Sequence, residues 1–305
     1  MKKHLITLIL FASLVVAGCV YIVWDSIHRN TKTETKKNLP QITNYEIDTT
    51  RRDASEGASQ KRGNGLTATG EGPANLEEAQ EEVRLYALEH GLSPQYYPEY
   101  LVSRMINNPE LEDFVLNYPL GSSDVNPSDI SITRDISLAN GSVPFFLQWD
   151  ERWGYTTYGS DLMGLTGCGP TALSMVAVYL TGDNSLNPLA IAEYAMDNGY
   201  YDYETSSGTF WSLMSTGAEG LGLTVNEVPG EADSVINALE TGHPIICIMG
   251  PGDFTTEGHF IVLSSYSDGY VVVNDPNSIV NSEQLWSLDT IISQANGMWE
   301  YSYYG

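Results

Sequence analysis

Cys168 stands between two glycines in "TGCGPTALSM", directly before an apolar run with helical spacing. A cysteine attacks a carbonyl carbon only as thiolate, and a helix N-terminus or a cationic neighbour lowers the pKa of the thiol. We expect a helix after Gly169 with Pro170 at its first position, so that unpaired amides face the sulfur. The flanking glycines would let the backbone turn sharply and let a substrate approach. Cys168 is therefore a candidate nucleophile, although a cysteine in this setting is more often an apolar core residue.

A base for this thiol is expected at His259, which begins the apolar stretch "HFIVLSSY". Asp268 and Gly269 then predict a hairpin turn, and a second strand, "YVVVND", ends at Asp275. Because the start of one hairpin strand and the end of the other lie at the same edge, His259 and Asp275 should be neighbours. A two-residue turn offsets them by about three residues and a longer loop places them opposite, and the sequence leaves this open. A carboxylate there would orient the imidazole.

Of the other residues that could take part in catalysis, we expect one in the site and three outside it. Gln148 is the only glutamine shortly upstream of the cysteine, and with the Cys168 amide it could hold the oxyanion of a tetrahedral intermediate. His90 and His243 are predicted to be exposed or structural. Cys247, inside "PIICIMG", is predicted to be inert.

These residues need a fold that brings a helix start to the edge of a sheet. Helical patterns come first in this part of the chain and strand patterns follow, which favours an α+β fold over an alternating parallel one. The expected helices after the cysteine segment are 188–199 and 208–222, and the expected strands are 244–250, 260–266 and 270–275.

The rest of the chain suggests five parts. Residues 1–30 contain two lysines and an apolar run long enough to span a membrane, and "VAGC" ending at Cys19 resembles a lipoprotein processing site. We favour an uncleaved anchor, with the acidic body outside the cytoplasm. A flexible linker, 31–72, a helical module, 73–120, a polar connector, 121–141, and the α+β domain, 142–305, would follow. In the module, Asn75 is a predicted N-cap, and two short helices broken at Pro109 follow the first helix.

Charge and composition exclude several partners. Residues 65–305 contain 4 basic and 33 acidic residues, so nucleic acid is not an expected partner. The three cysteines have no zinc-site spacing, and the acids of "DNGYYDYETSSG" do not match a calcium loop. We expect no metal and no cofactor.

Four segments together resemble the bacteriocin-processing-endopeptidase-like (C39-like) cysteine peptidases of the papain-like clan. They are "LQWDERWGYTTYG", "GCGPTALSM", "GHFIVL" and "VVVNDPNS". The resemblance implies a papain-like fold, with a nucleophile helix packed on an antiparallel sheet, and a catalytic set of Cys168, His259 and Asp275. It also implies Gln148 in the oxyanion hole, although this glutamine lies 20 residues before the cysteine, further than in many papain-like enzymes.

The resulting expectation is a membrane-anchored, extracytoplasmic cysteine peptidase that cleaves a peptide or protein through a thioester. The resemblance does not imply the substrate. Family members that cut after double-glycine leaders usually carry their peptidase domain on an ABC exporter, and this sequence contains no transporter spans and no nucleotide-binding motif. Two alternatives stay open. One is another acyl-transfer enzyme, such as a cell-wall amidase or a transglutaminase-like crosslinker, and the other is a surface binding module without turnover.

Overall fold

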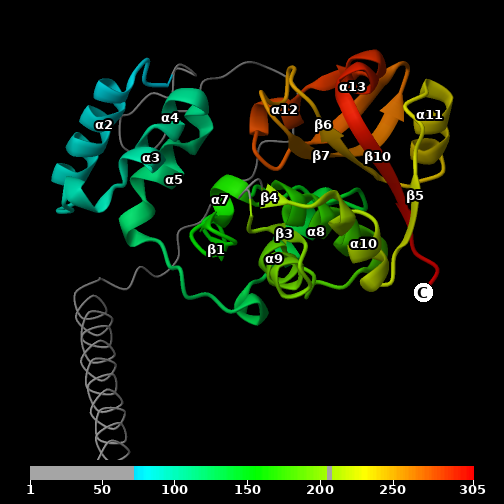
Figure 1. Cartoon of the computed structure of the whole chain (residues 1–305), viewed down its shortest axis with the longest axis horizontal. Coiled ribbons are helices and arrows are strands. Elements are labelled where there is room, and N and C mark those ends of the chain that lie inside the picture. Colours follow the sequence, from blue (N-terminus) through cyan, green and yellow to red (C-terminus); the bar gives the residue numbers. More distant parts are fainter. Residues whose placement is uncertain (1–71, 205–207) are drawn as a thin grey trace, which may run out of the picture. The chain divides into compact units, whose positions relative to one another are not determined.

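A six-stranded antiparallel sheet dominates the computed structural model, which describes residues 72–204 and 208–305 (Figure 1). The strand order is β5-β10-β6-β7-β8-β9, and every neighbouring pair is antiparallel. The strands are β5 Thr224–Glu227, β6 Ile245–Met249, β7 His259–Ser267, β8 Tyr270–Asn274, β9 Leu285–Ser287 and β10 Ala295–Ser302. This confirms the α+β class, and the three strands predicted from apolar runs are the central β6, β7 and β8.

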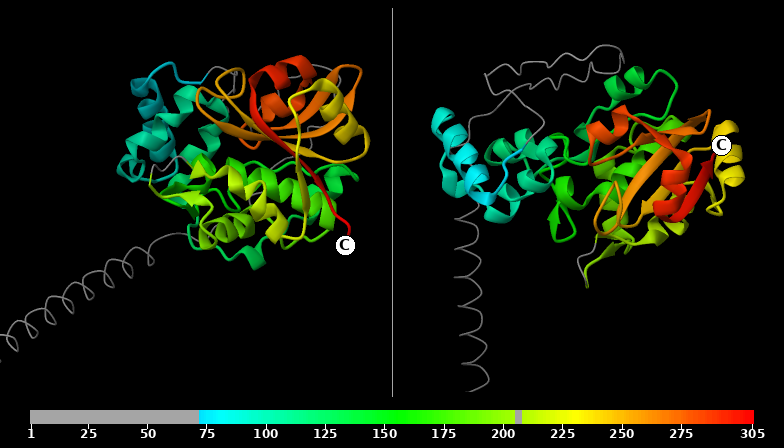
Figure 2. Two further views of the ribbon diagram at one scale, coloured as in Figure 1. Left: turned by 45° about the vertical axis from the view of Figure 1, so that its right-hand side comes forward. Right: turned by 90° about the horizontal axis from the view of Figure 1, so that it is seen from above.

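Helices cover both faces of the sheet (Figures 1 and 2), and its central strands bury side chains on both faces. In β6, Ile246 and Ile248 join the core on one face of the sheet, whereas Ile245, Cys247 and Met249 join the core on the other. Successive side chains of a strand point to opposite faces of the sheet. Because both faces are buried at β6, all of its residues are apolar. The covering helices are α8 Cys168–Thr181, α9 Pro188–Asp197, α10 Thr216–Gly220, α11 Ala232–Glu240 and α13 Leu288–Gln294.

Helix α8 is the central helix of the domain. It ends at Gly182, whose φ of 70° is the left-handed conformation that glycine adopts readily. Ten consecutive residues, 169–178, are buried, as expected for a helix packed on all sides. The helix begins at Cys168 itself rather than after Gly169, so Pro170 occupies its third position and not its first.

The hairpin predicted at Asp268 and Gly269 is formed by β7 and β8, and its turn has two residues, which the sequence had left open. Asp268 and Gly269 have φ values of 50° and 89°, and Ser267 pairs with Tyr270 across the turn. Positive φ at both turn positions suits the right-handed twist of the strands, which is why Asp-Gly favours this turn.

The predicted helix over 208–222 is wrong in its first half. Gly208 has a φ of 95°, which no α-helix accommodates, and Gly208–Thr209 forms β4, paired with β3, Tyr201–Asp202. A 3-10 turn, Trp211–Leu213, and the short α10 follow. The remaining small elements of the domain are β1 Thr157–Tyr158, β2 Asp161–Leu162, α7 Met163–Thr166 and α12 Ile279–Glu283.

The helical module begins with a helix that Asn75 caps, as predicted, by accepting a hydrogen bond from the Glu78 amide. The rest is more broken than the two further helices we expected, because prolines begin three of its turns or helices and cannot continue a helix. The elements are α2 Leu76–Glu89, α3 Glu99–Val102, α4 Arg104–Asn107 and α5 Glu112–Leu116, with 3-10 turns at Pro94–Tyr96, Pro109–Leu111 and Tyr118–Leu120.

The module and the domain share a hydrophobic core. Phe114 of α5 stacks on Tyr155 with ring centroids 4.5 Å apart, and Trp149, Leu162 and Leu165 pack against the same cluster. The expected polar connector also contains structure, a 3-10 turn at Pro127–Asp129 and α6, Thr133–Ala139.

The predicted anchor, 1–30, and nearly all of the predicted linker lie outside the described residues. Within residues 72–204 and 208–305, no helix is both long enough and apolar enough to cross a bilayer.

Candidate active site

Cys168 is the first residue of α8 and is partly exposed. The glycines beside it serve packing rather than the sharp turn we expected, since Gly167 has an ordinary φ of −86°. A methyl group at Gly167 would clash with Met163, and one at Gly169 would clash with Thr209 of β4. The two glycines therefore let neighbouring elements approach the start of α8 closely.

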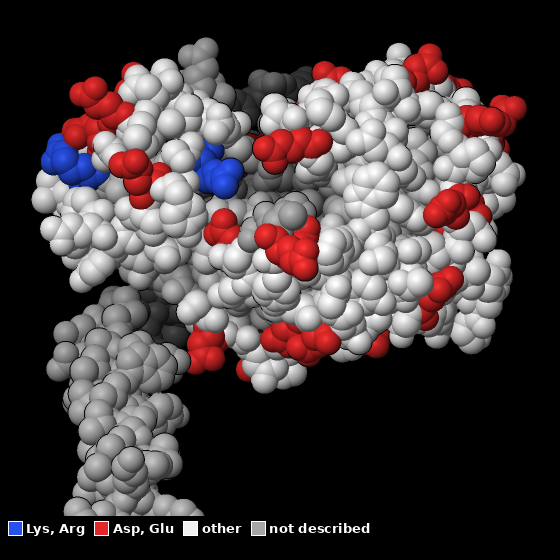
Figure 3. Space-filling view, in the orientation of Figure 1, with Lys and Arg blue, Asp and Glu red and all other residues white. Residues whose placement is uncertain are grey.

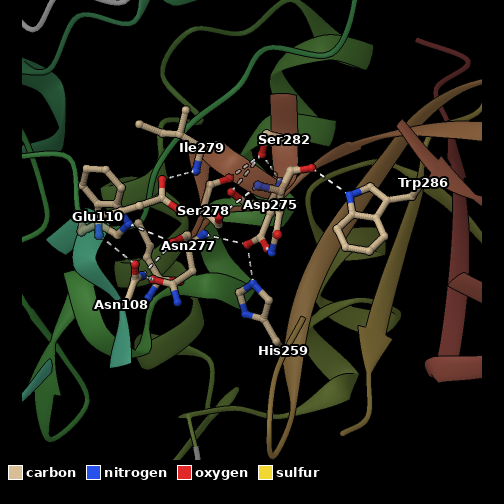
Figure 4. Close-up of polar contacts among 12 residues, drawn as sticks. Asn108, Glu110, His259, Asp275, Asn277, Ser278, Ile279, Ser282 and Trp286 are labelled. Atoms are coloured by element: carbon tan, nitrogen blue, oxygen red, sulfur yellow. Dashed lines mark hydrogen bonds and ion pairs between the residues drawn. The ribbon is translucent and has the colours of Figure 1, made fainter. Parts of the chain in front are cut away.

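The structure brings Cys168, His259 and Asp275 together. His259 is the first residue of β7, and Asp275 directly follows β8. The Nε2 atom of His259 lies 2.6 Å from Oδ1 of Asp275 (Figure 4). The same ring interacts with the Cys168 side chain through a hydrogen bond and through its charge, for which Nδ1 is the nitrogen left. The backbone amide of Phe260 is a second hydrogen-bond partner of Cys168.

An irregularity in β7 decides how His259 and Asp275 face each other. Counted from the two-residue turn, an uninterrupted ladder would place Asp275 across from Val262, three residues from His259 and on the opposite face of the sheet. One extra residue in β7, Ser264, shifts the ladder so that Val262 pairs with Asn274 instead. Asp275 then lies two residues from His259 in register and on the same face.

The ionisable groups of this cluster shift one another's pKa values. Burial alone would raise the pKa of Cys168, but the hydrogen bond and charge of His259 outweigh it, and the net pKa is lowered. Burial would lower the pKa of His259, but the negative charge and hydrogen bond of Asp275, with those of Cys168, raise it to about 10. Both shifts favour the same pair, a thiolate beside an imidazolium.

Asp275 is held by donors that the sequence argument missed (Figure 4). Its Oδ1 also accepts from the Asn277 amide at 2.8 Å, its Oδ2 accepts from Nδ2 of Asn281 at 2.8 Å, and its own amide donates to Oγ of Ser282 at 2.9 Å. The signal was present in "DPNSIVNS", where Ser278 lies three residues before Asn281 and caps α12 by accepting from the amide of that residue. These bonds fix the carboxylate that orients the imidazole.

Gln148 is buried, with its side chain 3% exposed. Its backbone amide donates to the carbonyl of Pro276 at 2.7 Å, and Pro276 directly follows Asp275. Its side-chain Nε2 donates to the carbonyl of Gly164 at 3.0 Å, and its Oε1 has no hydrogen-bond partner among the described residues. One Nε2 hydrogen is thus used, and the second is the one that could reach an oxyanion.

Cys247, His90 and His243, which we did not expect in the site, are not part of this cluster. Cys247 is fully buried in β6, where desolvation alone raises its pKa far above the ordinary value. His90 caps the exposed end of α2, with Nδ1 2.9 Å from the carbonyl oxygen of Tyr86. His243 is half-buried in the turn before β6.

No group of three or more His, Cys, Asp or Glu side chains that could hold a metal occurs in the described part of the chain. On the face shown in Figure 3, acidic side chains are spread over the whole surface and basic ones appear only over the helical module. This agrees with the charge imbalance of the sequence.

No curated protein matches the chain, whereas several solved structures are similar to it at low sequence identity. Among solved structures, it is similar to the peptidase domain of Streptococcus ComA, a bi-functional ABC transporter of a quorum sensing pathway, at 18% identity over 46% of this chain and 93% of that one, with a TM-score of 0.37. A putative C39-like peptidase from Bacillus anthracis is 15% identical over 54% and 96% of the two chains, with a TM-score of 0.37.

A third similar structure is the double glycine motif protease of an AMS/PCAT transporter, solved with its leader peptide. It is 15% identical over 45% of this chain and 84% of that one, with a TM-score of 0.30. The sequence model of the Peptidase_C39 like family matches residues 141–305, which is more than half of the chain. The match covers the whole α+β domain and leaves out the module and nearly all of the connector before it. The chain therefore belongs to the Peptidase_C39 like family and is a cysteine-type peptidase.

Proposed function

We propose that Cys168, His259 and Asp275 form the catalytic triad of this peptidase, and that the enzyme hydrolyses a peptide bond through a thioester. The observation that carries the proposal is the position of the His259 ring, which hydrogen-bonds the thiol on one side and the Asp275 carboxylate on the other. A nucleophile, a base and an orienting group in this order are the arrangement that nucleophilic catalysis needs.

The chemistry follows from the charges of the pair. The Cys168 thiolate attacks the scissile carbonyl carbon and forms a carbon–sulfur bond, while the carbonyl electrons move to oxygen. Collapse of this intermediate breaks the carbon–nitrogen bond, and Nδ1 of His259 gives its proton to the leaving amine. A water molecule then gives a proton back to His259, attacks the thioester and releases the acid and the thiolate.

The oxyanion of each tetrahedral intermediate needs donors that are already in place. The Cys168 backbone amide, in the first turn of α8, is one candidate. The free Nε2 hydrogen of the buried Gln148 is the other, because this side chain reaches Gly164 in the helix directly before the nucleophile.

The proposal also covers the location of the enzyme and its substrate. The apolar segment of residues 1–30 supports a membrane anchor, either an uncleaved helix or a lipid at Cys19, with the peptidase outside the cytoplasm. The substrate is a peptide or protein, and the acidic surface makes cationic peptides the better class to test first.

The deciding experiment compares Cys168→Ala with Cys247→Ala, because the described part of the chain contains two free cysteines in opposite settings. We expect Cys168→Ala to lose at least ~10³-fold in kcat/KM on a cleaved peptide, whereas Cys247→Ala keeps kcat/KM and lowers only the melting temperature. The substrate panel should contain peptides, peptidoglycan fragments and acyl-acceptor amines. Turnover of only the last two classes would favour an amidase or a crosslinker, and equal activity of wild type and Cys168→Ala would remove Cys168 from the mechanism.

A further inference from the structure

We propose that Glu110 and Asn108 of the helical module are positioning residues that hold the loop of Asp275 in place, so that the module is a working part of the peptidase. The inference rests on the proposed role of Asp275. Both residues lie some 165 positions before this loop in the chain and precede the segment that the family model matches.

Glu110 binds the start of α12 with both carboxylate oxygens (Figure 4). Its Oε1 accepts from the Ser278 hydroxyl at 2.5 Å, and its Oε2 accepts from the Ile279 amide at 2.6 Å. The amide of Ile279 is at the first position of α12 and has no partner within the helix. The Ser278 hydroxyl oxygen already accepts from Asn281, so the hydroxyl proton is free to go to Glu110. The carboxylate thus completes the cap of α12.

Helix α12 in turn fixes the aspartate. Asn281 donates from Nδ2 to Oδ2 of Asp275, and the hydroxyl of Ser282 accepts from the Asp275 amide while it donates to the Ser278 carbonyl at 2.7 Å. The indole of Trp286 holds the far end of the helix by donating to the Asn281 carbonyl at 2.8 Å. A shift of α12 would therefore move both the backbone and the carboxylate of Asp275.

Asn108 holds the other side of the same loop. Its Nδ2 donates to the Asn277 carbonyl at 3.1 Å, where the indole of Trp149 also donates, at 3.3 Å. The Asn277 amide donates to the same Asp275 oxygen that His259 contacts. Asn108 and Glu110 flank Pro109 in one 3-10 turn, so a single rigid turn of the module contacts the loop at two points.

The Glu110 carboxylate is partly buried and hydrogen-bonded to the loop, as expected of a group that holds the loop in place. Burial and the negative charge of Asp275 raise the pKa of Glu110, and the hydrogen bonds from Ser278, Ile279 and Val280 oppose this rise in part. These donors are the groups that stabilise the partly buried carboxylate.

The test is a double-mutant cycle with Glu110→Ala and Asp275→Asn in the full chain, read as kcat, KM and the pH dependence of Cys168 alkylation. We expect Glu110→Ala to lower kcat by about 10-fold with little change in KM, because a displaced Asp275 misorients the imidazole. In the pH dependence of Cys168 alkylation, the change at high pH that His259 sets should move to lower pH, because a displaced Asp275 raises the pKa of His259 less. In the Asp275→Asn background, Glu110→Ala should have almost no further effect on kcat.

Two further variants separate positioning from stability. Glu110→Gln keeps one acceptor oxygen and should recover part of the lost kcat. Tyr97→Phe removes a buried hydrogen bond inside the module, to the Leu116 carbonyl at 2.8 Å, and does not touch the loop. It should lower the melting temperature without moving the pH profile.

The outcomes distinguish the two levels of the argument. If Asp275→Asn lowers kcat but Glu110→Ala does not, or if the losses add fully in the double variant, the positioning role is overturned and the triad stands. If Asp275→Asn itself leaves kcat unchanged, the proposed triad fails, and the inference fails with it.

Discussion

The two described cysteines show how a residue's surroundings determine its chemistry. Cys168 and Cys247 are the same side chain, yet the pKa of the first is lowered by His259 and the pKa of the second is raised by burial alone. The difference comes mainly from His259 at the start of β7, whose hydrogen bond and charge outweigh the effect of burial at Cys168. At the residue scale, therefore, His259 is the group that would activate Cys168 in the proposed mechanism.

Gln148 is the other residue whose role can be isolated. We expect Gln148→Ala to lower kcat by ~10²- to 10³-fold with a small change in KM, because an oxyanion donor acts in the transition state. Steady-state kinetics on the substrate found with the panel above would measure it, with the exposed Gln95→Ala as the matched control. A kcat within twofold of wild type would show that Gln148 supports only the fold, through its bonds to Gly164 and Pro276.

At the scale of elements, the hairpin was predictable and its irregularity was not. Asp268 and Gly269 specify the turn, because both adopt positive φ there, and short apolar runs indicate the strands. Nothing in the sequence marks Ser264 as the extra residue, since a bulge depends on how the two strands pair and not on the residue itself. The sequence therefore predicted that His259 and Asp275 are neighbours, whereas only the structure shows why they share a face.

Other parts of the site depend on contacts between segments distant in sequence. The donors that hold Asp275 come from α12 and from the module, and single-sequence patterns do not report such contacts. The same holds for the glycines beside Cys168, whose spacing suggested a sharp turn but which make room for Met163 and Thr209.

The contact between Gly169 and Thr209 gives a prediction at this scale. Gly169→Ala should lower the melting temperature and kcat together, because the added methyl group clashes with Thr209 and displaces the start of α8. Thr209→Gly in the same chain removes the clashing side chain and should restore a large part of kcat. Thermal unfolding and steady-state kinetics of the single and double variants would measure this, and an undiminished kcat in Gly169→Ala would contradict it.

On the scale of the whole molecule, the module and the family domain form one structural unit. Their shared core contains Phe114 from the module and Tyr155, Trp149 and Leu165 from the domain, and all described residues fall in one compact unit. The boundaries we expected from composition, at 120 and 142, therefore describe segments of the sequence, and whether the segments fold separately stays a prediction to test.

A truncation provides that test. The fragment 141–305 should melt at a lower temperature than the fragment 72–305, and bind more of a hydrophobic dye, because removal of the module exposes the aromatic side chains of Tyr155 and Trp149. Calorimetry and dye fluorescence of the two fragments at equal concentration would show it. Equal melting temperatures would mean that the domain does not depend on the module.

Alkylation by iodoacetamide across pH tests most directly whether Cys168 is a thiolate paired with the His259 imidazolium. A Cys247→Ala chain leaves Cys168 as the reactive thiol of the described residues. We predict a midpoint of alkylation below the ordinary thiol pKa of 9.0, a second change near pH 10 as His259 loses its proton, and a single, higher midpoint in His259→Ala. A midpoint at or above 9.0 that His259→Ala does not move would contradict the account.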